Sequence, residues 1–196
     1  MNQAIQEQPG TKTTERPLYS PGLEGVIAGE SALCQVDEGE AGLRYRGYAI
    51  GDLAKWSRFE EVAYLLLIGH LPTRSELDSF STLLRGHRVL PDPVQRFIDS
   101  LQPGLHPMDV LRTGISLLGL SDPDAQDGSH EANLRKSMRL LSQIPLLIAH
   151  SYRVMSGILP PRQDESRDFA QHLLHLVAGH KAVSYAHLRA HETVLD

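Results

Sequence analysis

The sequence lacks several features that define common protein classes. Its 196 residues include one cysteine, Cys34, so no disulfide can form within the chain. No apolar run approaches the ~20 residues that a membrane-spanning helix needs, because the runs at 62–68 and 144–149 are short. A disulfide-dense secreted module and a membrane protein are therefore not expected, and the lone thiol favours a cytoplasmic location.

Runs of basic residues are also missing. The chain carries 24 acidic against 19 basic side chains, for a formal net charge of -5. A nucleic-acid-binding domain normally shows a basic patch, so nucleic acid is not an expected partner. Residues 1–20 contain Gln, Thr, Glu and Pro without the apolar segment of a signal peptide, which predicts a flexible polar arm.

Motifs of several enzyme classes are absent. There is no glycine-rich phosphate loop and no G-x-S-x-G elbow. The densest histidine group is His172, His175, His180, His187 and His191. Two of its pairs have helical spacing, but the zincin order H-E-x-x-H is absent because Glu192 follows His191. Solvent-facing positions are therefore favoured over metal ligation for His172 and His175, and His70 and His150 are expected to cap or pack.

Two further residue types were considered for chemistry. Cys34 lies on a predicted strand with no local feature that would lower its pKa, so packing is favoured over a nucleophilic role. Four arginines could each clamp a carboxylate or phosphate through a bidentate fork, although isolated arginines on amphipathic elements are more often rim residues. They are Arg44, Arg46, Arg112 and Arg139. The residues by themselves assign no catalytic, cofactor-binding or metal-binding position.

The first part of the chain predicts a small β-structure. Residues 23–37 are rich in small and β-branched side chains, and residues 43–50 approach an alternating apolar and polar pattern. Both strands are weakened by glycines. A β-hairpin or meander is expected here.

From Ser57 onward the pattern becomes helical. Ser57 with Glu60, and Thr73 with Glu76, have the spacing of a capping box, followed by apolar residues that end at Gly69 and Gly86. Further helices are expected after Pro91, after Pro107, over about 131–156 and over about 166–178. The expected inward residues are Leu77, Phe80, Leu83 and Leu84, then Val94, Phe97, Ile98 and Leu101, then Met108, Leu111, Ile115 and Leu118, then Leu134, Met138, Leu141, Ile144, Ile148 and Met155, and finally Phe169, Leu173, Leu176 and Val177.

The longest helix has a distinct middle. Residues 144–149 are apolar nearly all round, which is typical of a core helix that others surround, and Pro145 is expected to kink it. No fixed-period repeat is present. The predicted fold class is mainly α, an irregular multi-helix bundle with a small N-terminal β-hairpin.

Five blocks of sequence resemble one enzyme family. They are PGLEGVIAGESALCQVD, LRYRGYAIGDLA, FEEVAYLLLIGHLPTRSEL, HPMDVLRTGISLLG with SDPD, and NLRKSMRLLSQIPLLIA. Their order over residues 21–179 is similar to that in the N-terminal part of bacterial citrate synthases and 2-methylcitrate synthases. The resemblance implies an almost entirely helical fold with a large and a small domain, and a homodimer or higher homo-oligomer.

The same resemblance implies an activity. A citrate synthase-like acyltransferase condenses acetyl-CoA, or propionyl-CoA in the methylcitrate cycle, with oxaloacetate; the acyl-CoA is a substrate, and no cofactor is implied. A carboxylate removes a proton from the acyl group and a histidine stabilises the enol.

The sequence departs from the family in its last part. The HADHE-like and PLHGGAN-like motifs are absent, and residues 181–196 do not follow the family pattern. We therefore interpret residues 21–180 as the N-terminal part of the large domain, truncated before the catalytic motifs, and 181–196 as a tail joined by a frameshift or assembly fault. Neither His187 nor His191 receives a catalytic role. The alternative function is a non-catalytic helical interaction module derived from this fold.

Overall fold

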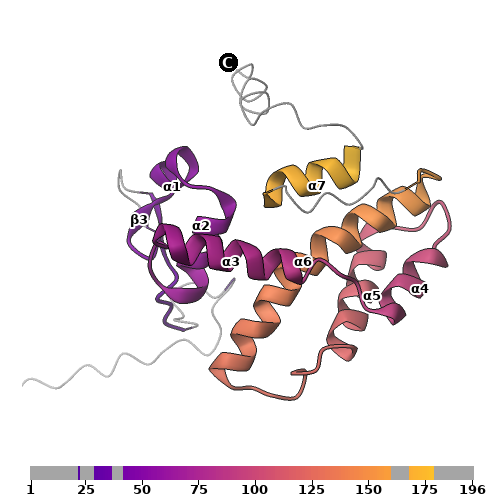
Figure 1. Cartoon of the computed structure of the whole chain (residues 1–196), viewed down its shortest axis with the longest axis horizontal. Coiled ribbons are helices and arrows are strands. Elements are labelled where there is room, and N and C mark those ends of the chain that lie inside the picture. Colours follow the sequence, from indigo (N-terminus) through magenta and orange to yellow (C-terminus); the bar gives the residue numbers. More distant parts are fainter. Residues whose placement is uncertain (1–21, 23–28, 37–41, 160–167, 179–196) are drawn as a thin grey trace, which may run out of the picture. The chain divides into compact units, whose positions relative to one another are not determined.

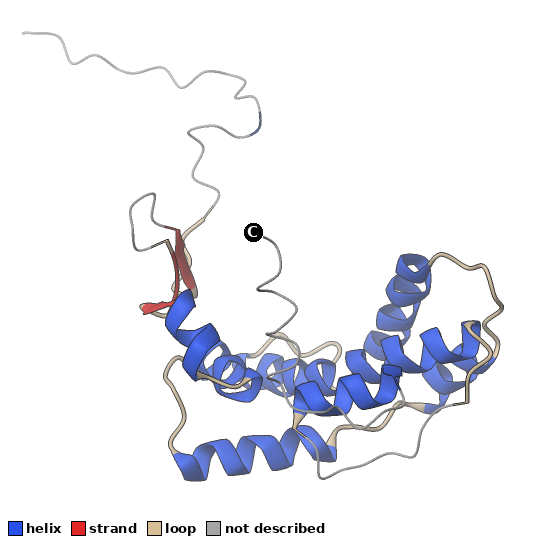
Figure 2. Ribbon diagram, turned by 90° about the horizontal axis from the view of Figure 1, so that it is seen from above, coloured by secondary structure: helices blue, strands red, loops and turns tan. Residues whose placement is uncertain are grey.

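The structure, a computed structural model, describes residues 22, 29–36, 42–159 and 168–178. The strands and helices of these residues belong to one compact unit that begins at Leu33. Helices dominate it, and the strands form one small sheet (Figure 2). The predicted fold class is confirmed, whereas the predicted arm at 1–20 and tail at 181–196 lie outside the described residues.

The sheet has three short antiparallel strands, β1 (Cys34–Val36), β2 (Leu43–Tyr45) and β3 (Tyr48–Ala49), in the order β1-β2-β3. Tyr45 pairs with Tyr48 across a two-residue turn. Both turn residues have positive φ, 48° at Arg46 and 89° at Gly47, which suits the right-handed twist of the flanking strands. Residues 43–50, which the sequence suggested as one strand, therefore contain two strands joined by a tight turn.

Two helices follow the sheet, α1 (Ile50–Trp56) and α2 (Phe59–Ile68). The sequence did not predict α1. It also placed the capping box of α2 one residue too early: the backbone N–H of Arg58 donates to the Glu61 carboxylate at 2.7 Å. Ser57 instead ends α1, where its N–H bonds to the carbonyl of Leu53.

The next helices, α3 (Arg74–Gly86) and α4 (Asp92–Asp99), match their local signals. The Thr73–Glu76 capping box begins α3, since the backbone N–H of Thr73 donates to the Glu76 carboxylate at 2.8 Å. Phe80 and Leu84 are buried, but Leu83 is 44% exposed and does not belong to the inward face. The predicted core residues Val94 and Ile98 of α4 are fully buried.

The inward face of α5 (Pro107–Leu120) matches the prediction at Leu118 but not at Met108 and Ile115. The buried residues are Val110, Gly114 and Leu118, whereas Met108 is 60% exposed and Ile115 is 37% exposed. A Cβ atom at Gly114 would lie 2.5 Å from Leu147 Cδ1. The absent side chain therefore allows α5 to approach the long helix closely, and this contact fixes which face of α5 is buried.

The long helix α6 (His130–Met155) is the centre of the bundle, as the sequence predicted. It contacts α3, α4, α5 and the last described helix, α7 (Phe169–Ala178), which runs beside it (Figure 1). The helix continues unbroken through Pro145, and Leu146, Leu147 and Ala149 are buried. Ile148 was expected to face inward but is 42% exposed. Among the described residues, we find no helix whose length and hydropathy would let it cross a bilayer.

Candidate functional site

An apolar groove lies where α2, α6 and the beginning of α7 meet. It encloses about 510 Å³, and the described residues that line it include a single hydroxyl side chain, Ser137. The other lining residues are Phe59, Val62, Ala63, Leu66, Leu67, Leu140, Leu141, Ile144, Pro145 and Phe169. Such a surface offers dispersion contacts and no charge, so it suits an apolar group rather than a reacting one.

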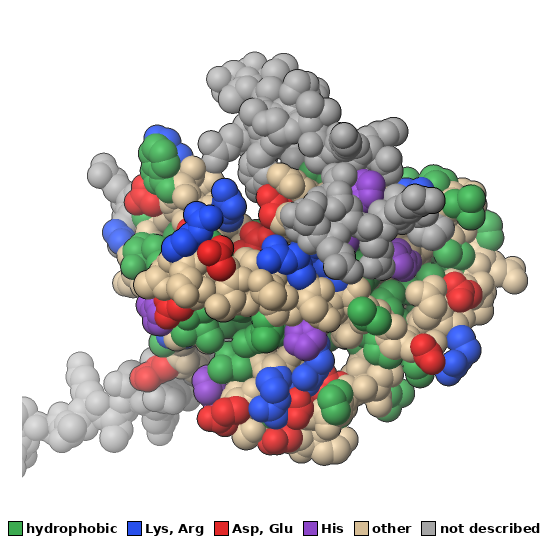
Figure 3. Space-filling model, in the orientation of Figure 1, with side chains coloured by type: hydrophobic (Ala, Val, Ile, Leu, Met, Phe, Trp, Pro, Cys, Tyr) green, Lys and Arg blue, Asp and Glu red, His purple; other side chains and the backbone are tan. Residues whose placement is uncertain are grey.

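A second, charged hollow of about 1150 Å³ lies between α1, α2, α3 and the first turn of α7. Its charged lining residues are Lys55, Arg58, Arg74, Arg85 and Arg88 together with Glu60, Glu61, Asp78 and Asp168. Basic groups gather along α3 on the face shown in Figure 3. Its chemistry suits the binding of charged ligands.

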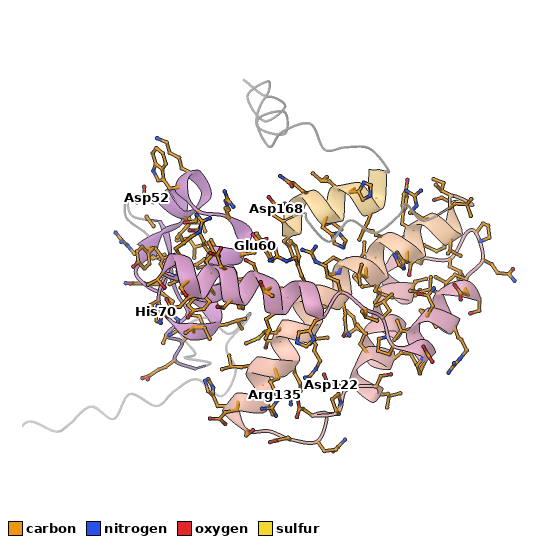
Figure 4. All side chains as sticks on the ribbon, viewed as in Figure 1. Asp52, Glu60, His70, Asp122, Arg135 and Asp168 are labelled. Atoms are coloured by element: carbon orange, nitrogen blue, oxygen red, sulfur yellow. The ribbon has the colours of Figure 1, made fainter. Side chains whose placement is uncertain are left out.

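The first turn of α7 is held by α2. Glu60 is 7% exposed, and its Oε1 accepts a 2.7 Å hydrogen bond from the backbone N–H of Phe169. The rings of Phe59 and Phe169 stack with centroids 3.8 Å apart. Asp168 lies beside Glu60 (Figure 4), and its Oδ1 accepts from the backbone N–H of Gln171 at 2.8 Å. Two carboxylates thus satisfy N–H groups at the positive end of the helix dipole.

The other end of α7 is held by Arg153 of α6, which is 7% exposed. Its guanidinium donates to the carbonyls of Leu176 and Val177 at 3.3 and 3.2 Å, and to the carbonyl of Leu159. The last carbonyls of a helix have no partner within the helix, and a cation is favourable there. Arg153 therefore caps α7 from a neighbouring helix.

A separate ion-pair network fixes the loop between α5 and α6. Arg139 is 14% exposed and donates to Asp122 through Nε and Nη2 at 2.8 and 2.7 Å, and to Asp124 at 2.6 Å. Arg135 makes a second bidentate pair with Asp124, and Asp122 lies near Arg135 (Figure 4). Arg139 is therefore a structural anchor, and its expected place at a rim was wrong.

The network shifts both carboxyl groups in the same direction. Hydrogen bonds from Arg135 and then from Arg139 hold the pKa of Asp124 far below its usual range. Burial raises the pKa of Asp122, but hydrogen bonds from Arg139 and the backbone of Asp124 outweigh that effect and leave the pKa lowered. Both carboxylates are ionised at neutral pH.

His172 and His175 do not lie where the sequence predicted them. His172 is 4% exposed and His175 is half-buried, so neither faces solvent. The reason is that α7 packs against both α2 and α6, which leaves little of its circumference free. His180, His187 and His191 lie outside the described residues. Within the described part of the chain, no cluster of three or more His, Cys, Asp or Glu residues could hold a metal ion.

The predicted packing roles of His70 and His150 hold in part. His70 is exposed, and its ring and the Tyr64 ring pack edge to face, with centroids 5.5 Å apart. His150 is half-buried, and its pKa is lowered by burial and by the nearby charge of Arg153, with Asp99 acting in the opposite direction.

Three of the remaining candidates, Cys34, Arg44 and Arg46, lie on the small sheet and its turn, and Arg112 lies on α5. Cys34 is exposed on β1, as are the other two residues of that strand, so its predicted packing role was wrong. Arg44 donates to the carbonyl of Gly47, and Arg46 donates to the carbonyl of Leu66 at 3.5 Å. Arg112 pairs with Asp109 on the exposed face of α5.

Sequence reasoning missed Glu60 and Arg153. Glu60 was used in the misplaced capping box, although a second glutamate directly after it was available for that role. Arg153 had a usable signal, because it is the one Asp, Glu, Lys or Arg of α6 after Arg139, at the end of the apolar half of the helix. Neither signal shows that Glu60 and Arg153 bind the backbone of α7.

Comparison with known proteins identifies the relatives of this fold. The family model described as "Citrate synthase, C-terminal domain" matches residues 22–195. The 2-methylcitrate synthase of Shewanella oneidensis is 38% identical over 181 residues, which cover 92% of this chain and 47% of that protein. The chain therefore spans about half the length of the curated relatives it matches.

Solved structures show the same fold. The crystal structure of citrate synthase from Thermotoga maritima superposes with a TM-score of 0.72 at 32% identity, over 83% of this chain and 42% of that one. Citrate synthase from Thermoplasma acidophilum, solved as a ternary complex with carboxymethyl coenzyme A and oxaloacetate, gives a TM-score of 0.74 over 85% of this chain and 44% of its own. At 24% identity, the second comparison concerns the fold alone.

Proposed function

The chain belongs to the citrate synthase family, and we propose that it forms the N-terminal part of an enzyme that condenses an acyl-CoA with oxaloacetate. The match of the family model to residues 22–195 is the observation that carries this proposal. The product would be citrate from acetyl-CoA or 2-methylcitrate from propionyl-CoA. The matched relatives include proteins named citrate synthase and proteins named 2-methylcitrate synthase.

In this reaction the acyl-CoA loses a proton from the carbon next to the thioester. A carboxylate accepts that proton and a histidine stabilises the enol, which attacks the ketone of oxaloacetate before the thioester is hydrolysed. We assign none of these roles to a residue of this chain. In this proposal the chain supplies helices of the large domain, and these helices pack around α6.

The proposal extends to assembly and location. We expect the enzyme to work as a homodimer or higher homo-oligomer in the cytoplasm. The apolar groove supports a requirement for further protein, because a surface lined almost wholly by aliphatic and aromatic side chains is stabilised when it is covered.

The test starts from the coding DNA. We expect the DNA downstream of this sequence to encode HADHE-like and PLHGGAN-like motifs, either in the same reading frame or in another one. The protein expressed from that longer sequence should release CoA thiol only when both oxaloacetate and an acyl-CoA are present. Comparing acetyl-CoA with propionyl-CoA then identifies the product.

Two outcomes would count against the proposal. One is a longer protein that lacks condensation activity with either acyl-CoA. The other is a genuine stop codon directly after residue 196, which would favour the non-catalytic helical interaction module.

A further inference from the structure

We draw no further inference here: the strongest candidate, the apolar groove between α2, α6 and the beginning of α7, already supports the proposed function, and nothing in the described part of the chain shows which segment or partner covers it.

Discussion

The carboxylate of Glu60 and the backbone N–H of Phe169 are joined by a 2.7 Å hydrogen bond between residues 109 positions apart in the sequence. The bond lies where α7 begins and is almost sealed from solvent, since Glu60 is 7% exposed. Arg153 binds the carbonyls at the other end of the same helix. One acidic and one basic side chain, from α2 and α6, thus fix both ends of α7.

Replacing Glu60 tests the first of these contacts. Glu60→Ala removes the acceptor of a helix N-terminal N–H and should lower the free energy of unfolding by about 1–2 kcal/mol. Glu60→Gln keeps an acceptor oxygen and should cost less. The measurement is urea unfolding followed by circular dichroism, with the exposed Glu131→Ala as control. Equal stability of Glu60→Ala and the unaltered chain would show that α7 does not depend on this bond.

The contact of Arg153 is tested by Arg153→Met. Methionine keeps much of the apolar volume but leaves the carbonyls of Leu176 and Val177 without their donor, so we expect a loss of about 2–3 kcal/mol in unfolding free energy. Arg112→Met, on the exposed face of α5, should change stability by less than about 0.5 kcal/mol. If both variants unfolded at the same urea concentration, the capping role of Arg153 would be refuted.

The close approach of α5 and α6 predicts opposite effects for two glycine substitutions in one helix. Gly114→Ala places a Cβ 2.5 Å from Cδ1 of the fully buried Leu147 and should destabilise the protein by about 1–3 kcal/mol. Gly119→Ala meets no atom within 4 Å and should stabilise α5 by up to about 1 kcal/mol. Thermal unfolding of the two variants gives the answer. A stabilising Gly114→Ala would mean that the two helices are not in close contact.

The ion-pair network of the loop before α6 predicts sensitivity to acid. The pKa values of Asp122 and Asp124 are lowered in the folded state, so their ionised forms are favoured there. This contribution is fully present above the unfolded pKa of about 4 and is lost as the pH falls through the lower folded values. Unfolding free energy should therefore decrease on going from pH 5 towards pH 2.

The variant Arg139→Gln separates this network from other acidic groups. It removes the donor that Asp122 and Asp124 share, so the decrease in unfolding free energy below pH 4 should be smaller than in the unaltered chain. The measurement is urea unfolding at a series of pH values. The same pH dependence in both proteins would show that the network does not hold the carboxylates ionised.

Local signals in the sequence determined most of the helices and the family. The capping box at Thr73 and Glu76, Pro107 in the first turn of α5, and the apolar spacing of Val94 and Ile98 act within one or two turns, so they are legible without a partner. The central place of α6 followed from its apolar middle, which had to be surrounded.

Tertiary structure decided the contacts between those helices. Of the apolar stripe predicted for α5, Leu118 is buried, but Met108 and Ile115 are exposed and Val110 is buried instead, because α5 approaches Leu147 through Gly114. His172 became buried because α7 packs against both α2 and α6, whereas Cys34 lies on a strand whose three residues are all exposed. Periodicity measures which residues share a face, but burial depends on what packs against that face, and this is a property of segments far apart in the sequence.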